Sequence, residues 1–176
     1  LVLSVSVRAE FSGLVLEDEK HWETYGKGGT CISGSHNLFI ADVDDDGVLE
    51  VLTGGFMYNI VNGERTTSLA PLKIWNWTGD KLVLEKNHYW DGNIRCIFCE
   101  DIDSDGVMEI LTGGSVLGDS GSFYSIRVWC YDGVDVVLKG SYDGVSVNSI
   151  FVSDLDKDGE AEVLTTGRAS YNVQSR

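Results

Sequence analysis

Three acidic segments of one pattern hold the residues best suited to chemistry in this chain. Each reads D-x-D-x-D-G-x-x-E, at residues 42–50, 101–109 and 154–162. In a tight loop, side chains at positions 1, 3 and 5 converge on one point. A glycine at position 6 permits the turn, the position 7 carbonyl can add a ligand, and a later carboxylate completes the shell. Oxygen donors with no His or Cys among them favour calcium over zinc or copper. Magnesium fits less well, because it retains water and takes fewer protein ligands.

The predicted calcium ligands are the first, third, fifth, seventh (through its carbonyl) and ninth residues of each segment, which gives about three calcium ions per chain. They are Asp42, Asp44, Asp46, Val48 and Glu50; Asp101, Asp103, Asp105, Val107 and Glu109; and Asp154, Asp156, Asp158, Glu160 and Glu162.

Electrostatic repulsion supports a bound cation. Two carboxylates about 4 Å apart repel by about 4 kcal/mol at an effective dielectric constant near 20. Four converging carboxylates therefore strain a domain whose total stability is about 5–15 kcal/mol. The alternative is three solvated acidic turns, and the threefold repetition of the same four carboxylates disfavours it.

The charge balance excludes several functions. The chain has 28 acidic and 13 basic residues, a net charge of −15. This argues against a nucleic-acid groove, which needs clustered Lys and Arg, and against electrostatic attachment to anionic lipid. No apolar run reaches about 18 residues, so no membrane span is predicted.

The segments flanking each motif indicate strands. An EF-hand has Glu at position 12 between helices, but here that position holds Thr53, Thr112 and Thr165. The flanks are rich in β-branched, aromatic and Gly residues, so each motif is predicted to be a β-hairpin loop. A second hairpin follows each of the first two. Strands are expected near residues 36–42, 50–54, 72–77, 82–86, 95–101, 109–113, 124–131, 135–140, 148–154 and 162–166, and at the N-terminus near 3–10 and 14–19.

These strands form a repeat. Phe39, Phe98 and Phe151 each precede the first Asp of a motif by three residues. The predicted organisation is a single repeat domain over 1–176: the second hairpin of a split blade (1–33), two complete blades (34–92 and 93–145) and the first hairpin of a split blade (146–176). Four-stranded repeats of this length predict an all-β fold, with four-stranded antiparallel blades of a β-propeller. The chain would hold three blade equivalents, permuted by half a blade.

The motif and its frame resemble the calcium-binding FG-GAP repeats of integrin α-subunit propellers and their prokaryotic relatives. The resemblance implies a loop between the first two strands of a blade, with the first, third, fifth and ninth motif residues as ligands. It also implies a non-catalytic role in adhesion, recognition or surface assembly, outside the cell or at the cell surface. The ninth residue is Glu where that family more often has Asp, and the Phe-Gly and Gly-Ala-Pro signatures are absent.

Other functions stay open at this point. A polysaccharide lyase or hydrolase, or a lectin, could use the same scaffold, and the partner could be a protein or a glycan. Three blades cannot close a ring, since propellers typically have four to eight. Self-association or further blades from a longer chain are therefore expected. The Cys96-x-x-Cys99 pair is predicted to lie in a strand as two buried thiols on opposite faces.

Overall fold

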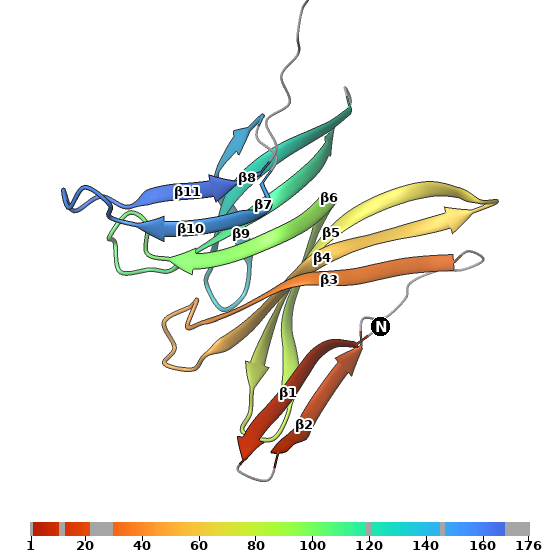
Figure 1. Cartoon of the computed structure of the whole chain (residues 1–176), viewed down its shortest axis with the longest axis horizontal. Coiled ribbons are helices and arrows are strands. Elements are labelled where there is room, and N and C mark those ends of the chain that lie inside the picture. Colours follow the sequence, from red (N-terminus) through yellow and green to blue (C-terminus); the bar gives the residue numbers. More distant parts are fainter. Residues whose placement is uncertain (1, 11–12, 22–29, 119–120, 145–146, 168–176) are drawn as a thin grey trace, which may run out of the picture.

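Every regular element of the described chain is a β-strand. The computed structural model describes residues 2–10, 13–21, 30–118, 121–144 and 147–167. All strand pairs are antiparallel (Figure 1), which confirms the all-β prediction. No helix able to cross a membrane is found in these residues. The strands are β1 (Val2–Glu10), β2 (Gly13–His21), β3 (Thr30–Ala41), β4 (Glu50–Val61), β5 (Glu64–Trp77), β6 (Leu82–Glu100), β7 (Glu109–Gly118), β8 (Gly121–Tyr131), β9 (Val136–Asp143), β10 (Ser149–Ser153) and β11 (Glu162–Thr166).

The long strand β6 joins two four-stranded units. Its first part, up to Asp91, pairs with β5, and its second part, from Gly92, pairs with β7. We call β3, β4, β5 and the first part of β6 unit 1, and the second part of β6 with β7, β8 and β9 unit 2. The sequence predicted two separate strands at 82–86 and 95–101, which is wrong: the intervening residues stay extended. Gly92 adopts a φ of 142° where the strand passes from one unit to the next.

The hairpins repeat in register. The first hairpin of each unit carries the acidic loop and pairs Phe39 with Leu52 or Phe98 with Leu111, and β10–β11 pairs Phe151 with Leu164 in the same way. We call these three hairpins the acidic hairpins, of which β10–β11 is the third.

The second hairpins also share one register. They pair Trp75 with Leu84 in unit 1 and Trp129 with Leu138 in unit 2. The N-terminal hairpin β1–β2 pairs Val7 with Leu16. In all three hairpins the register shifts at the same place, immediately before Val7, Trp75 and Trp129. The backbone of β1–β2 is therefore built as a second hairpin.

The described strands form three sheets: β1–β2, β10–β11 and the seven-stranded sheet β3 to β9. They do not close into a ring, so the propeller stays a prediction. The division at 33, 92 and 145 also stays a prediction, and its terminal segments lie partly outside the described residues.

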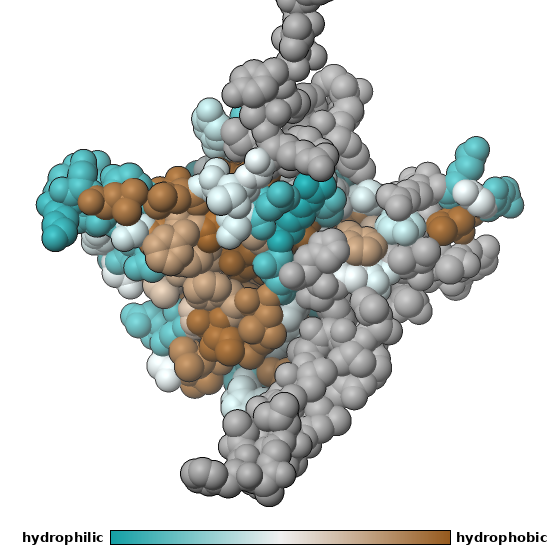
Figure 2. Space-filling view, viewed as in Figure 1, coloured by the Kyte–Doolittle hydropathy of each residue, from teal (hydrophilic) through white to brown (hydrophobic). Residues whose placement is uncertain are grey.

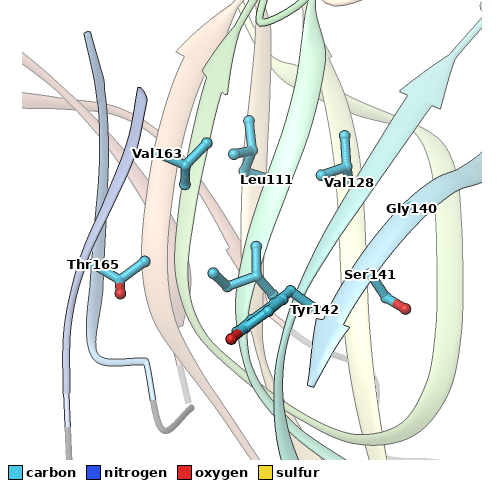
Figure 3. A pocket seen from close by; sticks show the side chains of 8 residues that line it. Leu111, Val128, Gly140, Ser141, Tyr142, Val163 and Thr165 are labelled. Carbon is cyan, nitrogen blue, oxygen red and sulfur yellow. The ribbon is translucent and has the colours of Figure 1, made fainter. Parts of the chain in front are cut away.

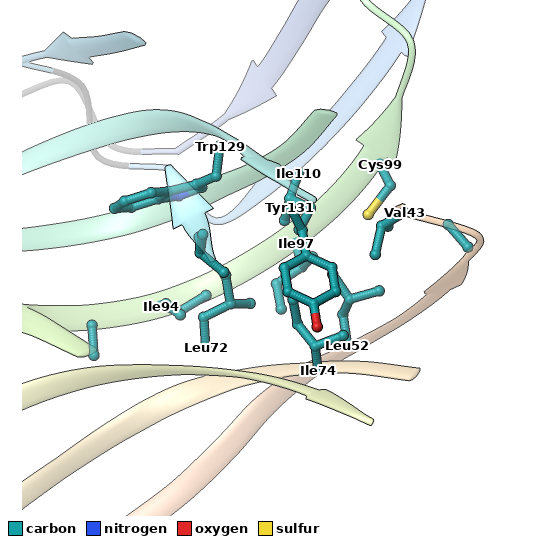
Figure 4. Close-up of a cluster of buried hydrophobic side chains, with 13 residues drawn as sticks. Val43, Leu52, Leu72, Ile74, Ile94, Ile97, Cys99, Ile110, Trp129 and Tyr131 are labelled. Carbon is teal, nitrogen blue, oxygen red and sulfur yellow. The ribbon is translucent and has the colours of Figure 1, made fainter. Parts of the chain in front are cut away.

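Two apolar clusters hold the units together. The larger lies between units 1 and 2, where Leu52, Leu72 and Ile74 face Ile97, Trp129 and Tyr131 (Figure 4). The smaller lies between unit 2 and β10–β11 and contains Cys96, Leu111, Val147, Ile150 and Val152. Each unit is thus buried against the next one along the chain, which is how repeated sheets acquire a continuous core.

Two further contacts recur from unit to unit. The indole Nε1 of Trp75 donates to Thr53 Oγ1 at 3.0 Å, and that of Trp129 donates to Thr112 Oγ1 at 2.9 Å. The Phe98 ring lies between Phe39 and Phe151, with centroid distances of 5.1 and 5.4 Å. The repeated residues therefore build repeated contacts.

Candidate metal centre

The acidic segments are the loops of the three acidic hairpins, as predicted. They connect β3 to β4, β6 to β7 and β10 to β11. In the first loop, the Asp42 carboxylate accepts the backbone N–H groups of Asp46 at 3.1 Å and Gly47 at 3.0 Å. Asp101 and Asp154 accept the equivalent N–H groups in their own loops. The first residue of each motif thus folds the loop around its own carboxylate.

The ninth residue anchors the far end of each loop. One carboxylate oxygen of Glu50 accepts the N–H of Val43 at 2.9 Å. Glu109 and Glu162 accept the N–H of Ile102 and Leu155 at 3.0 and 2.8 Å. The loop N–H bonds to Oε2 in each case, which leaves the lone pairs of Oε1 available to a further partner. In Glu109, Oε1 accepts a hydrogen bond from the Cys130 thiol.

Two positions of each loop adopt left-handed backbone angles. The glycine at position 6 has φ of 85°, 91° and 95° in the three loops. Position 4 is also left-handed, although it holds Asp45, Ser104 and Lys157. A non-glycine residue there costs about 1–3 kcal/mol, so the loop is held in this shape by the bonds around it.

Each loop brings three carboxylates together. The triads are Asp42, Asp44 and Glu50; Asp101, Asp103 and Glu109; and Asp154, Asp156 and Glu162. Within each triad, one oxygen from every residue lies within 4.8 Å of the others. Each triad can therefore hold a metal ion.

The fifth and seventh positions are not part of the triads. Oδ1 of Asp46, Asp105 and Asp158 instead accepts the N–H of position 7, at 2.7, 2.8 and 2.9 Å. Ligation by these Asp residues, and by the carbonyls of Val48, Val107 and Glu160, stays a prediction.

The first triad is the most enclosed. Glu50 and Glu109 each expose 1% of their surface, and Asp44 Oδ1 is buried without a hydrogen-bond partner. Burial raises the pKa of Glu50 to about 7, with further contributions from Asp44 and Asp46. Burial also raises the pKa of Asp44, again with a contribution from Asp46. Buried carboxylates that repel one another are stabilised by a cation among them.

Unit 2 flanks the first loop, which the sequence did not predict. A Cβ atom on Gly133, in the β8–β9 turn, would lie 3.0 Å from Asp44 Oδ2. Burial, Glu85 and the loop carboxylates Asp44 and Glu50 raise the pKa of Tyr131 to about 12. Lys86 of unit 1 pairs with Asp135 in the same turn. No local pattern signals this contact, because it depends on how the two units pack.

Cys96, Cys99 and Cys130, the cysteines whose side chains the structure describes, are not members of the triads. Cys96 and Cys99 are buried, free thiols. Cys99 belongs to the larger apolar cluster and Cys96 to the smaller, so the two side chains point to opposite faces of β6, as predicted. Cys130 is half-buried, and its Sγ lies 3.4 Å from Glu109 Oε1.

No family model matches the sequence, and a search of curated proteins finds no relative. The site is therefore interpreted from its own geometry and chemistry.

Proposed function

We propose that this protein is a calcium-binding module of β-propeller blades, non-catalytic, that serves adhesion, recognition or surface assembly outside the cell or at its surface. The observation that carries the proposal is the threefold recurrence of one loop: the same hydrogen bonds, the same left-handed positions and the same convergent triad. Three solvated acidic turns would have no reason to share these hydrogen bonds, backbone angles and triads.

Calcium is the ion that fits the donors best. Each triad offers carboxylate oxygens, and the fifth and seventh positions offer further oxygens on the same loop. Calcium takes six to eight oxygen ligands in flexible geometry, whereas magnesium demands a tight octahedron. Binding would fix the hairpin loops, and a protein or glycan partner would bind elsewhere on the module.

A lectin is the weaker alternative. Sugar platforms at equivalent positions require exposed aromatic rings, but Trp75 and Trp129 are buried and bonded to threonines. An enzyme of the lyase or hydrolase type would need acidic groups free for proton transfer. The groups of three or more such side chains in the described residues are the triads, which this proposal assigns to calcium.

Thermal melting tests the proposal. An ion that binds only the folded state at one hundred times its dissociation constant stabilises it by about 2.7 kcal/mol per site. For a domain of this size, each kcal/mol raises Tm by about 2–4 °C. We expect calcium to raise the Tm of chelator-treated protein by several degrees or more and magnesium to have a much smaller effect. Equal responses to both ions would contradict the calcium assignment.

A further inference from the structure

The third acidic hairpin, β10–β11, exposes apolar side chains whose counterparts in the other two acidic hairpins are buried or half-buried. Leu52 and Leu111 are fully buried, whereas Leu164, at the same register position, is 38% exposed. Phe39 and Phe98 are half-buried, whereas Phe151 is 58% exposed. The residue types are the same, so the difference lies in what covers them. Leu52 and Leu111 are covered by the following unit or hairpin, and among the described residues no further strand follows β11.

An apolar slot opens beside this hairpin. It has a volume of about 430 Å³ and lies between unit 2 and β11, where Val163 and Thr165 face Leu111 and Tyr142 (Figure 3). Ile126 and Val128 line the same slot and are half-buried. We call this slot, together with Phe151, Leu164 and the outer edge of β11, the end surface.

The matching space between units 1 and 2 shows what fills such a slot. In unit 1, Leu72 and Ile74 occupy the register positions that Ile126 and Val128 occupy in unit 2. Both Leu72 and Ile74 are fully buried. The Trp129 ring covers this space, 5.1 Å from His88, which matches Tyr142. Trp129 belongs to a second hairpin. The end slot therefore has the shape left when a second hairpin is missing.

The opposite end of the chain has the complementary exposure. Leu38 and Ile40 on β3 are 52% and 53% exposed. Their counterparts Ile97 and Cys99 pack against unit 1, and Ile150 and Val152 pack against unit 2. Figure 2 shows apolar side chains gathered over the β3–β4 and β10–β11 hairpins. We call Leu38, Ile40 and the hairpin β1–β2 the start surface.

The chain itself carries the hairpin that the end slot lacks. In register, Val7, Ala9 and Leu14 of β1–β2 stand where Trp129, Tyr131 and Val136 stand in unit 2. All three are apolar. In the described structure β1–β2 forms a two-stranded sheet of its own, and β11 pairs only with β10. Unpaired strand edges accept a further strand.

We propose that two copies of this chain associate head to tail, the start surface of one docking on the end surface of the other. The donated β1–β2 hairpin pairs with β11 and fills the end slot, and Leu38 and Ile40 cover Phe151 and Leu164. The contact repeats the unit 1–unit 2 interface already present within the chain. It is heterologous, so it closes as a ring or continues as a filament. It uses apolar side chains and strand pairing, and none of the triad residues.

Sedimentation and light scattering of the full chain test this at micromolar concentration with calcium present. We expect the unaltered protein to assemble, and Ile40→Asp and Leu164→Asp each to be monomeric, because each variant places a charge in one apolar surface. An equal mixture of the two variants retains one intact start and one intact end surface and should give a discrete complex of two copies. Val61→Asp, at the exposed β4–β5 turn, is the matched control and should assemble normally.

Three results would overturn the proposal. They are a monomeric unaltered protein, a mixture that stays monomeric, or equal disruption by the Val61→Asp control. A monomeric unaltered protein would assign the end surface to another occupant, such as a further unit of a longer chain. Circular dichroism melting checks that both variants fold, and both altered side chains are at least one-third exposed. Calcium binding by a monomeric protein would leave the proposed function intact.

Discussion

At the residue scale, the account depends on carboxylates that are close together and partly buried. Glu50 and Glu109 are buried, and in each loop their carboxylate lies close to those of the first and third motif residues. The sequence predicted that positions 1, 3, 5 and 9 converge, because the spacing leaves few other arrangements for a tight loop; the triads contain positions 1, 3 and 9. It did not predict that the N–H of position 7 binds the fifth carboxylate. That bond depends on the left-handed fourth and sixth residues, which only the folded backbone reveals.

Removing one central carboxylate should remove one calcium site. Asp103→Asn keeps the shape of the side chain but loses its charge, so the second loop should lose its ion while the other loops keep theirs. Calorimetry should count about two calcium ions where the unaltered protein binds about three. Ser104→Asn in the same loop is the control, because Asn tolerates the left-handed backbone at that position. Loss of all sites in Asp103→Asn would contradict independent loops.

The buried thiols of β6 should resist alkylation in the folded protein. Burial raises the pKa of Cys96 to about 11 and raises that of Cys99 as well. Thiolate is the reactive form, so its fraction stays small at pH 8 and rises only as the pH approaches the raised pKa. Mass spectrometry after iodoacetamide treatment should find both thiols unmodified in folded protein and modified in denaturant. Rapid labelling of either under native conditions would contradict their burial.

At the element scale, the strands were predictable from the pattern of apolar residues, but their continuity was not. Twelve short strands were expected, and each coincides with part of one of the eleven observed. The sequence predicted a connecting tail at residues 90–92, between the strands at 82–86 and 95–101, because Asp91 and Gly92 are turn formers. In the structure, His88, Tyr89 and Trp90 pair with β5, so the segment stays extended. Whether such a segment is a strand or a turn depends on its pairing partner, which the sequence does not reveal.

Glycine sets the spacing between units. A Cβ on Gly113 would lie 2.5 Å from both Cys96 Sγ and Val147 Cγ1, inside the smaller cluster. We expect Gly113→Ala to destabilise the protein by about 1–3 kcal/mol, because it overpacks this contact. Gly140→Ala is the matched control, since nothing lies within 4 Å of a Cβ there. Denaturant unfolding measures both, and equal stability would contradict close packing at Gly113.

At the scale of the whole molecule, the chain is a stack of repeated hairpins. Each contact between neighbouring units uses the same register positions. The sequence predicted the order of the hairpins, because the motif and the Phe before it recur. It did not predict that the β8–β9 turn lies against Asp44. Tertiary packing alone brings that turn to the first loop.

Calcium titration of chelator-treated protein by calorimetry tests the central claim most directly. The account predicts about three calcium ions bound per chain, one at each triad, and much weaker binding of magnesium. The absence of calcium binding up to millimolar concentration, or the same response to magnesium, would contradict it.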